Sequence, residues 1–327
     1  MRIAINGFGR IGRTILRLLH STRAGEGIEV TAINDIAPLA SCAYLFRYDS
    51  VFGPFPGDVG HDAESLSVNG QRIPFTAHPD IRALDLSGVD VVLECTGAAG
   101  NRAGAEAGLD AGAAAVLISG PSGAADVTVV LGANEGDIGD HRIISNASCT
   151  TNALAPLLKV LDEGPGVVSG HMTTVHCYTG SQPTIDRPHA DLARSRAAAL
   201  SMVPTTTSAG RLIGVVLPHL EGRIEARAVR VPTASVSAID LALQTRERVG
   251  ADQVNALLKG RVGDIFGWVE EPLVSTDLRG RPESLVISAP ETSVSVGGLV
   301  RIFGWYDNEW GFSNRMLDMA RRIAARK

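Results

Sequence analysis

The sequence predicts an α/β protein with two differently built halves, and three observations support this prediction. Within the first 150 or so of its 327 residues, short apolar runs alternate with helical stretches, which is typical of βαβ units and a parallel sheet. A glycine-rich turn joins the first predicted strand to the first predicted helix. Later apolar runs are longer and alternate with polar residues, which predicts antiparallel or mixed strands covered by helices on one face.

The spacing of apolar residues divides the first half into predicted helices and strands. Ile15, Leu18 and Leu19 recur at helical spacing and predict a helix over Arg13–His20, and an alanine-rich stretch predicts another over Asn101–Ala111. Asn69-Gly70 is a strong two-residue turn signal, so Ser65–Phe75 is expected to be a hairpin inserted in the parallel pattern. The predicted strands are Arg2–Asn6, Ile28–Asn34, Val89–Glu94, Ala115–Ser119, Val127–Leu131 and Arg142–Ser145.

The second half begins with a predicted helix over about Thr150–Leu161 and ends with an amphipathic helix over Asn308–Arg326. Between them, Gly180–Pro204 is irregular and rich in Pro, His and Arg, and a loop of that length inside a compact domain is usually functional. The predicted strands are Val167–Tyr178, Ile224–Val231, Ser235–Gln244, Leu285–Ile287 and Leu299–Tyr306.

Composition excludes several classes of function. The chain has 30 basic and 35 acidic residues, a net charge of -5, and no long block of either sign, which argues against nucleic-acid or membrane-surface binding. No apolar stretch approaches the ~18 residues of a membrane helix, and the N-terminal residues do not resemble a signal peptide. Four cysteines make no disulfide framework in a chain this long, and no Cys/His spacing resembles a zinc site. We therefore expect a cytoplasmic protein without a metal.

The glycine-rich turn Gly7–Gly12 fits the pattern G-x-G-x-x-G, and it follows a predicted strand and opens a predicted helix. In that context Gly7 permits a tight turn, Gly9 lets a pyrophosphate approach the backbone, and Gly12 allows close packing of helix on strand. Asp35 ends the second strand, where an acid can bind ribose hydroxyls and repel a 2′-phosphate. The turn therefore predicts a dinucleotide site that prefers NAD. A ligand-free tight turn, with Asp35 as an ordinary turn residue, is the alternative.

Cys149 lies in a polar segment, Ser145–Asn152, that is followed at once by apolar residues. This pattern predicts a helix with Ser148 as its N-cap and Cys149 in its first turn, where the helix dipole favours a thiolate. Cys42 and Cys95 have apolar neighbours and are expected to fill the core, whereas Cys149 is a candidate nucleophile.

A nucleophilic cysteine needs a base, and His176 is the candidate among eight histidines. It ends the predicted strand Val167–Tyr178 just before the long irregular segment, where a side chain can reach a cleft. A structural histidine is an equally good interpretation of this position from the residues alone. The histidines in loops and at element ends, among them His78, are expected on the surface.

The ordered combination of these segments resembles the phosphorylating glyceraldehyde-3-phosphate dehydrogenase family. The segment Ser-Cys-Thr-Thr-Asn at Ser148–Asn152 is highly specific, and the resemblance extends from Arg2 to the last helix. The segments that support it are Ile5–Gly12, Ala32–Asp35, Glu94–Gly97, Ser145–Asn152, Met172–Gln182, Arg194–Ala198, Ala228–Thr233 and Trp305–Gly311.

The resemblance implies a Rossmann NAD-binding domain over residues 1–148, completed by a C-terminal helix at 308–327, and an α+β catalytic domain over 149–307. It also implies a homotetramer. Cys149 would attack the aldehyde, His176 would pair with the thiolate and take the hydroxyl proton, and hydride transfer would leave a thioester. Inorganic phosphate would then release an acyl phosphate, so the implied partners are a sugar phosphate and inorganic phosphate.

The resemblance further assigns roles to polar residues. Arg230 and Thr179 match the position that binds the substrate phosphate, and Arg194 and Thr207, with Ser148 and Thr150, match the side that binds inorganic phosphate. A surface salt bridge is the alternative for any single arginine. Asn308 would bind the nicotinamide carboxamide, or else form a turn or an N-cap. The implied cofactor-binding set is Gly7, Gly9, Arg10, Ile11, Gly12, Asp35, Thr96, Ser119 and Asn308.

Four positions depart from the family pattern: Ala153 where many members have a second cysteine, Ser208 in place of glycine, Ser181 after Thr179-Gly180, and Arg187 before a proline. Ser208 could add a phosphate contact or crowd the site. Arg187 could tolerate a 2′-phosphate, which leaves use of NADP open. Other segments resemble erythrose-4-phosphate dehydrogenase, but Tyr178-Thr179 favours the triose phosphate. A cofactor-binding protein without catalysis is the remaining alternative.

Overall fold

The computed structural model describes residues 1–326, which form two compact units. The first unit comprises Met1–Val129, Glu135–Ala147 and the chain from Ser313 onward, and the second comprises Val130–Asn134 and Ser148–Phe312. The C-terminal helix expected at 308–327 is observed as α7, Trp310–Ala324, and position 327 lies outside the described residues.

A single sheet organises the first unit, and its strand order is β10-β11-β9-β8-β1-β2-β7-β6-β5. The strands from β10 to β7 are all parallel to their neighbours, as the alternation of strands and helices predicts. The strands are β1 Arg2–Asn6, β2 Glu29–Asn34, β5 Val59–His61, β6 Ser65–Val68, β7 Gln71–Thr76, β8 Val91–Glu94, β9 Ala115–Ile118, β10 Val127–Thr128 and β11 Ile143–Ser145, with a separate pair β3 Tyr48–Asp49 and β4 Gly53–Pro54.

The predicted hairpin is present but is not an insertion in the sheet. β6 and β7 pair in antiparallel fashion across Asn69-Gly70, whose φ angles of 50° and 80° are the left-handed values that this turn requires. β7 also pairs parallel to β2, with Asn34 opposite Thr76. The hairpin therefore extends the parallel sheet, and the carboxyl end of β7 reaches the same edge as the carboxyl end of β2.

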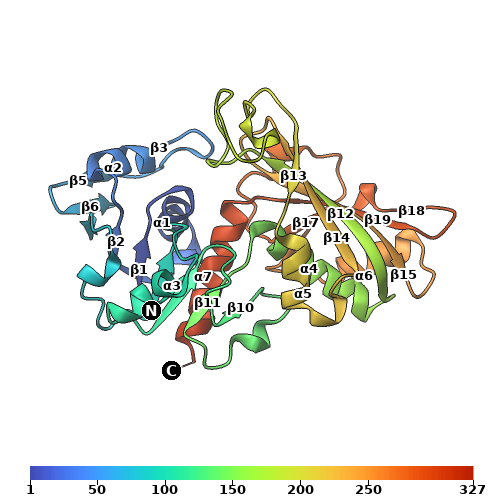
Figure 1. Ribbon diagram of the computed structural model, residues 1–327, viewed down its shortest axis with the longest axis horizontal. Coiled ribbons are helices and arrows are strands. Elements are labelled where there is room, and N and C mark those ends of the chain that lie inside the picture. Colours follow the sequence, from blue (N-terminus) through green and yellow to red (C-terminus); the bar gives the residue numbers. More distant parts are fainter. Residues whose placement is uncertain (327) are drawn as a thin grey trace. The chain divides into compact units, whose positions relative to one another are not determined.

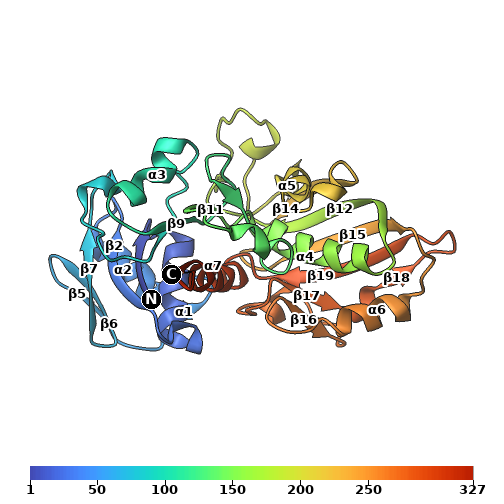
Figure 2. The ribbon, with the colours of Figure 1, turned by 90° about the horizontal axis from the view of Figure 1, so that it is seen from below.

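Helices cover both faces of this sheet, with α1 and α3 on opposite sides (Figure 2). α1 spans Arg10–Ser21, three residues longer at its start than predicted, because its glycine-containing first turn shows no apolar periodicity. The remaining helices are α2 Leu39–Arg47 and α3 Arg102–Asp110, with short 3-10 turns at Arg23–Gly25, Ile81–Ala83 and Glu135–Ile138.

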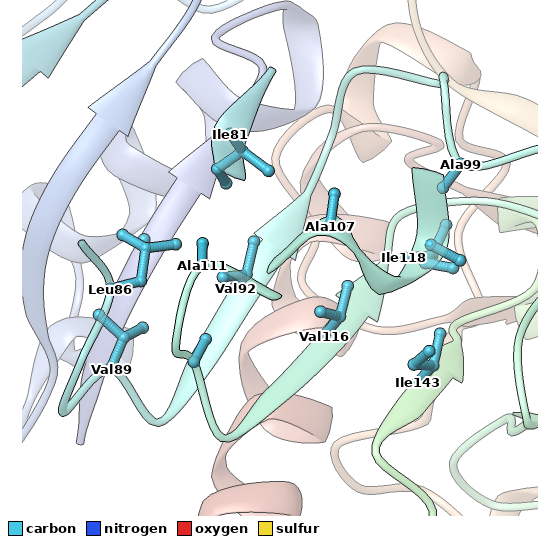
Figure 3. Packing of buried hydrophobic residues seen from close by; sticks show 13 residues of the cluster. Ile81, Leu86, Val89, Val92, Ala99, Ala107, Ala111, Val116, Ile118 and Ile143 are labelled. Atoms are coloured by element: carbon cyan, nitrogen blue, oxygen red, sulfur yellow. The ribbon is translucent and has the colours of Figure 1, made fainter. Parts of the chain in front are cut away.

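Small residues bring α3 close to the sheet (Figure 3). Ala105 and Ala107 are buried against Val92 and Val116 of β8 and β9. A Cβ placed on Gly108 would lie only 2.8 Å from Val116 Cγ2, so the helix approaches the strands more closely than a larger residue would allow. The alanine-rich composition of this segment is thus explained by packing.

The second unit is built on a mixed sheet of order β13-β14-β12-β15-β19-β17-β16, with β18 paired to β19 (Figure 1). β12 is parallel to β14 and antiparallel to β15, which confirms the predicted mixed architecture. The strands are β12 Val167–Cys177, β13 Val203–Thr206, β14 Ile224–Val231, β15 Ser237–Thr245, β16 Phe266–Val269, β17 Leu285–Ser288, β18 Ser293–Val294 and β19 Val300–Tyr306.

Two helices that contact each other, α4 (Cys149–Glu163) and α5 (Ala209–Val216), pack on this sheet against β12 and β14 respectively. The unit also contains α6 (Ala251–Lys259) and 3-10 turns at Ala193–Ser195, Pro218–Leu220, Ser275–Leu278 and Ala289–Glu291. The register pairs His176 of β12 with Arg230 of β14. The two strands therefore deliver an imidazole and a guanidinium to neighbouring positions. Among residues 1–326, no helix is long and apolar enough to cross a membrane.

Candidate active site

The backbone of the glycine-rich turn requires glycine at two positions. Gly7 has a φ of +92°, and a Cβ there would lie 2.6 Å from the Thr96 backbone nitrogen. A Cβ on Gly12 would lie 2.2 Å from the Gly7 carbonyl oxygen, so this glycine lets α1 pack against the turn. Gly9, by contrast, faces open space and lies just before the first residue of α1. Together these positions leave the N-terminus of α1 accessible to a phosphate group.

Asp35 lies at the end of β2 beside this turn. Its carboxylate accepts hydrogen bonds from the Phe8 backbone nitrogen (2.6 Å) and from the Ala37 backbone nitrogen (2.8 Å). It also lines a cavity of about 540 Å³ together with Gly7, Gly9 and Thr96. Asp35 thus both fixes the turn and lines the cavity. It can therefore be a turn residue and a ligand of the ribose at the same time.

The other expected cofactor-binding residues have different surroundings. Arg10 and Ile11 form the first turn of α1, where Arg10 is ion-paired with Asp49. Ser119 follows β9, and its backbone nitrogen donates to the Glu94 carbonyl oxygen. Asn308 belongs to the second unit and precedes α7.

Two residues of the first unit differ from expectation. Cys95 is not core filler, because it is only partly buried and lines the cavity. His78 also lines the cavity, and it follows β7. The sequence did not place it there because the parallel pairing of β7 with β2 was not anticipated.

A buried polar network beneath the turn also escaped the sequence analysis. Asn6 Nδ2 donates to the Glu94 carboxylate at 2.5 Å, and Asn34 Nδ2 donates to Asn6 Oδ1 at 2.9 Å. The same carboxylate accepts from the Thr96 backbone nitrogen at 2.9 Å. These residues come from the ends of three adjacent strands, so the network fixes the floor of the cavity.

Cys149 lies in the first turn of α4, as predicted, and is the first residue of that helix. Ser148 is the N-cap, and its Oγ accepts a hydrogen bond from the Thr151 backbone nitrogen at 3.1 Å. Ala147 precedes the cap with a φ of 54°, an unusual value for a residue with a side chain. The cap and this turn place the sulfur at the N-terminal end of the helix.

His176 brings a base to the sulfur. Cys149 Sγ lies 3.6 Å from His176 Nε2, and His176 Nδ1 lies 2.7 Å from the Cys177 carbonyl oxygen. A proton on Nδ1 that is donated to this carbonyl leaves the lone pair of Nε2 facing the sulfur. Arg230 Nη1 lies 2.6 Å from Nδ1 and donates to the Cys177 carbonyl at 3.2 Å. A guanidinium can only donate, so its contact with Nδ1 favours the opposite tautomer, whereas the carbonyl contact favours the one in which Nε2 accepts. The interpretation of His176 as a merely structural residue therefore loses support.

The charges at this pair differ from the expected thiolate and imidazolium. Burial raises the pKa of the Cys149 thiol, and this effect exceeds the opposing influence of Arg230 and of hydrogen bonds from Thr150. Burial and Arg230 lower the pKa of His176 to about 4. Both directions favour a neutral thiol beside a neutral imidazole, and a neutral imidazole can act as a general base.

Tyr306 supports the pair and was not singled out from the sequence. Its buried hydroxyl lies 2.9 Å from Thr150 Oγ1 and 2.8 Å from Thr174 Oγ1, and its ring lies edge-on to the His176 ring, with centroids 6.0 Å apart. It links the first turn of α4 to β12. Thr150, expected on the phosphate side, uses its hydroxyl in this buried contact. The only indication of Tyr306 in the sequence is that it belongs, with Asn308, to the segment Trp305–Gly311, which resembles the family.

The anion-binding candidates form separate groups. Arg194 Nε donates to Thr205 Oγ1 at 2.7 Å, and the same guanidinium is ion-paired with Asp191. Thr205 belongs to β13, next to the strand that bears Arg230, and sequence analysis missed it because β13 begins at the end of the irregular segment Gly180–Pro204 and was not predicted as a strand.

The remaining hydroxyls are tied locally. Thr179 Oγ1 contacts Ser181 Oγ at 3.0 Å, and Thr207 Oγ1 accepts from the Ala209 backbone nitrogen at 3.2 Å. Ser208 is the N-cap of α5 without a side-chain capping bond. Within the described part of the chain, no hydrogen bond joins Thr179, Thr207 or Ser208 to the Cys149–His176 pair.

Arg187 lies in the irregular segment, where its backbone nitrogen donates to the Ser195 carbonyl and its side chain lines a cavity of about 260 Å³. Across residues 1–326, no group of three or more His, Cys, Asp or Glu side chains is arranged to hold a metal ion.

Comparison with known proteins gives consistent matches over both units. Residues 1–102 match the glyceraldehyde 3-phosphate dehydrogenase NAD-binding domain, and residues 148–308 match the C-terminal domain of the same family. The chain is 49% identical to glyceraldehyde-3-phosphate dehydrogenase of Pseudomonas aeruginosa, over 99% of this chain and 98% of that protein. It is 46% identical to the Xanthobacter flavus enzyme, over 98% and 97%, and 44% identical to glyceraldehyde-3-phosphate dehydrogenase 1 of Bacillus subtilis, over 99% and 98%.

Proposed function

Since the chain belongs to the glyceraldehyde-3-phosphate dehydrogenase family, we propose that Cys149 and His176 are its catalytic residues. The chain is an NAD-dependent phosphorylating dehydrogenase that acts on glyceraldehyde 3-phosphate. The observation that carries the assignment of the pair is the 3.6 Å contact of Cys149 Sγ with His176 Nε2 at the N-terminus of α4.

The first stage of the reaction uses the neutral pair directly. Sγ attacks the aldehyde carbon and forms a C–S bond while Nε2 takes the thiol proton and passes it to the carbonyl oxygen, which becomes the hydroxyl of a hemithioacetal. His176 then assists loss of the hydroxyl proton as the C–H bond breaks, which leaves a thioester. NAD, when bound, accepts the hydride. Backbone N–H groups in the first turn of α4 stabilise negative charge on the substrate oxygen.

The second stage conserves the energy of oxidation. A phosphate oxygen attacks the thioester carbonyl, the C–S bond breaks, and an acyl phosphate leaves while Cys149 regains its proton. Both sugar phosphate and inorganic phosphate are anions, and arginine suits them because its guanidinium binds phosphate through two hydrogen bonds. We assign Arg230 and Thr179 to the substrate phosphate, and Arg194, Thr207 and Ser208, with Ser148 and Thr150, to the inorganic phosphate.

NAD fits the first unit. The glycine-rich turn, the free N-terminus of α1 and the cavity beside Asp35 suit a dinucleotide. We assign NAD binding to residues 1–148 with the C-terminal helix at 308–327, and catalysis to 149–307. The proposed cofactor contacts are Gly7, Gly9, Arg10, Ile11, Gly12, Asp35, Thr96, Ser119 and Asn308.

We propose a homotetrameric assembly, and the irregular segment supports association between copies of the chain. Four large apolar side chains of this segment, Ile185, Leu192, Leu200 and Met202, are each strongly exposed. Apolar side chains that gather on one segment are commonly covered in an oligomer. Light scattering of the purified protein measures the assembly. Four free cysteines agree with a reducing compartment, and we propose the cytoplasm.

Comparison of two aldehydes tests the substrate assignment. We expect kcat/KM for glyceraldehyde 3-phosphate to exceed that for erythrose 4-phosphate, measured with NAD and with NADP, with and without phosphate. A higher kcat/KM for erythrose 4-phosphate, with water replacing phosphate, would overturn the assignment.

The carboxylate of Asp35 is expected to control cofactor choice. Its negative charge repels a 2′-phosphate, so Asp35→Gly should raise the NADP/NAD ratio of kcat/KM by about tenfold, and Arg187→Leu should lower it. Asp35→Asn is the matched variant, because it keeps the shape of the side chain and removes the charge. Steady-state kinetics with both cofactors measures the ratio. An unchanged ratio in both Asp35 variants would show that this carboxylate does not face the ribose.

A further inference from the structure

The side-chain amide of Asn308 is held by two donors from neighbouring strands. Cys177 Sγ, at the end of β12, donates to Asn308 Oδ1 at 3.1 Å, and Ser237 Oγ, at the start of β15, donates to the same oxygen at 3.3 Å. The Cys177 backbone nitrogen in turn donates to Ser237 Oγ at 3.1 Å. Cys177 and Ser237 are 0% and 1% exposed, and Asn308 is 9% exposed.

These two hydrogen bonds determine the positions of the oxygen and the nitrogen of the Asn308 side-chain amide. An asparagine side chain has an acceptor oxygen and a donor nitrogen of similar size, and two donors on Oδ1 leave only one orientation satisfied. Nδ2 is consequently turned away from Cys177 and Ser237. Among residues 1–326, no group accepts a hydrogen bond from Nδ2. Burial raises the pKa of Cys177 to about 12, so its thiol keeps the proton that it donates.

The backbone around this amide is fixed as well. Asp307 is buried, and its carboxylate accepts hydrogen bonds from the backbone nitrogens of Gly280 (2.9 Å), Glu309 (3.0 Å) and Trp310 (2.8 Å). Asp307 rather than Asn308 therefore caps α7, which leaves the amide of Asn308 available for another role. Val236 has a φ of 66°, an outlier for a β-branched residue, and it directly precedes Ser237.

We propose that Cys177 and Ser237 are positioning residues that orient the amide of Asn308 so that Nδ2 donates to the carboxamide oxygen of the nicotinamide ring. This inference rests on the proposed function, which assigns Asn308 to the nicotinamide. It gives a role to a buried cysteine that the reaction itself does not use. The two residues act through Asn308 and touch neither the substrate nor the reacting atoms.

The test compares NAD with ADP-ribose, which lacks the nicotinamide ring, by titration calorimetry on the full-length protein. Cys177→Ala and Ser237→Ala should each weaken NAD binding by about three- to tenfold, the effect of one hydrogen bond, and leave ADP-ribose binding unchanged. Cys177→Ser, which keeps a donor, should restore NAD affinity. In an Asn308→Ala background, Cys177→Ala should have no further effect, because the residue acts only through the amide.

Three results would overturn the inference: unchanged NAD affinity in both alanine variants, equal weakening of NAD and ADP-ribose, or a Cys177→Ala effect that persists without the Asn308 amide. Ser237→Ala keeps the test valid where Cys177→Ala fails to fold. Failure of the proposed function is a different observation, since the wild-type protein would then bind no NAD or oxidise no aldehyde.

Discussion

Cys149→Ser is expected to lower kcat/KM for aldehyde oxidation by about 10⁴-fold or more, because it removes the only sulfur that faces His176 among the described residues. A serine hydroxyl in the same place is a far weaker nucleophile, and an oxygen ester would replace the thioester. The rate is measured from the absorbance of the reduced cofactor.

Cys42→Ala is the matched control for this substitution. Cys42 is buried in α2 of the first unit, and its replacement should leave kcat nearly unchanged. NAD binding to Cys149→Ser should also persist, because the glycine-rich turn is intact. Unchanged oxidation by Cys149→Ser would show that the reaction does not depend on this sulfur.

His176→Asn is expected to lower kcat by about 10²–10⁴-fold, the usual contribution of a general base. The pKa of His176 is lowered to about 4, so the imidazole is neutral and able to accept a proton at any pH well above that value. Alkylation of wild-type Cys149 by iodoacetamide should therefore persist well below the ordinary thiol pKa of about 8.5.

The same variant should move the alkylation profile to higher pH. Without the base, the reaction depends on free thiolate, and burial raises the pKa of Cys149. The rate of iodoacetamide reaction across a pH series, monitored by mass spectrometry of the Cys149 peptide, measures the shift. Wild-type reactivity that appears only near pH 8.5, or identical profiles for wild type and His176→Asn, would show that the imidazole does not activate the sulfur.

Features determined by neighbouring residues could be predicted from the sequence. Gly7 and Gly12 occupy positions where a Cβ would collide with backbone, and Ser148 caps the helix that begins at Cys149. For Gly12 and Ser148 the cause lies within a few residues of the motif, and for Gly7 the positive φ is local although the collision is with Thr96, so the spacing of these residues predicts the local geometry. The mixed sheet of the second unit followed from long alternating runs in the same way.

Features determined by strand register could not be predicted. The sequence does not show that β7 pairs with β2, so the position of His78 at the cavity was missed. Tyr306 contacts Thr150 and Thr174, which lie far from it in the chain, and Thr205 contacts Arg194 of another segment, so neither contact can be inferred from local spacing. The burial that raises the pKa of Cys149 could not be anticipated for a related reason, because it arises only from tertiary packing.

The central claim is that oxidation stops at a Cys149 thioester which only phosphate releases. A rapid-mixing experiment with glyceraldehyde 3-phosphate and NAD in phosphate-free buffer tests it most directly. We predict a burst of about one reduced cofactor per active site followed by little turnover, and full turnover when phosphate is added. Undiminished multiple turnover without phosphate or arsenate would contradict the account.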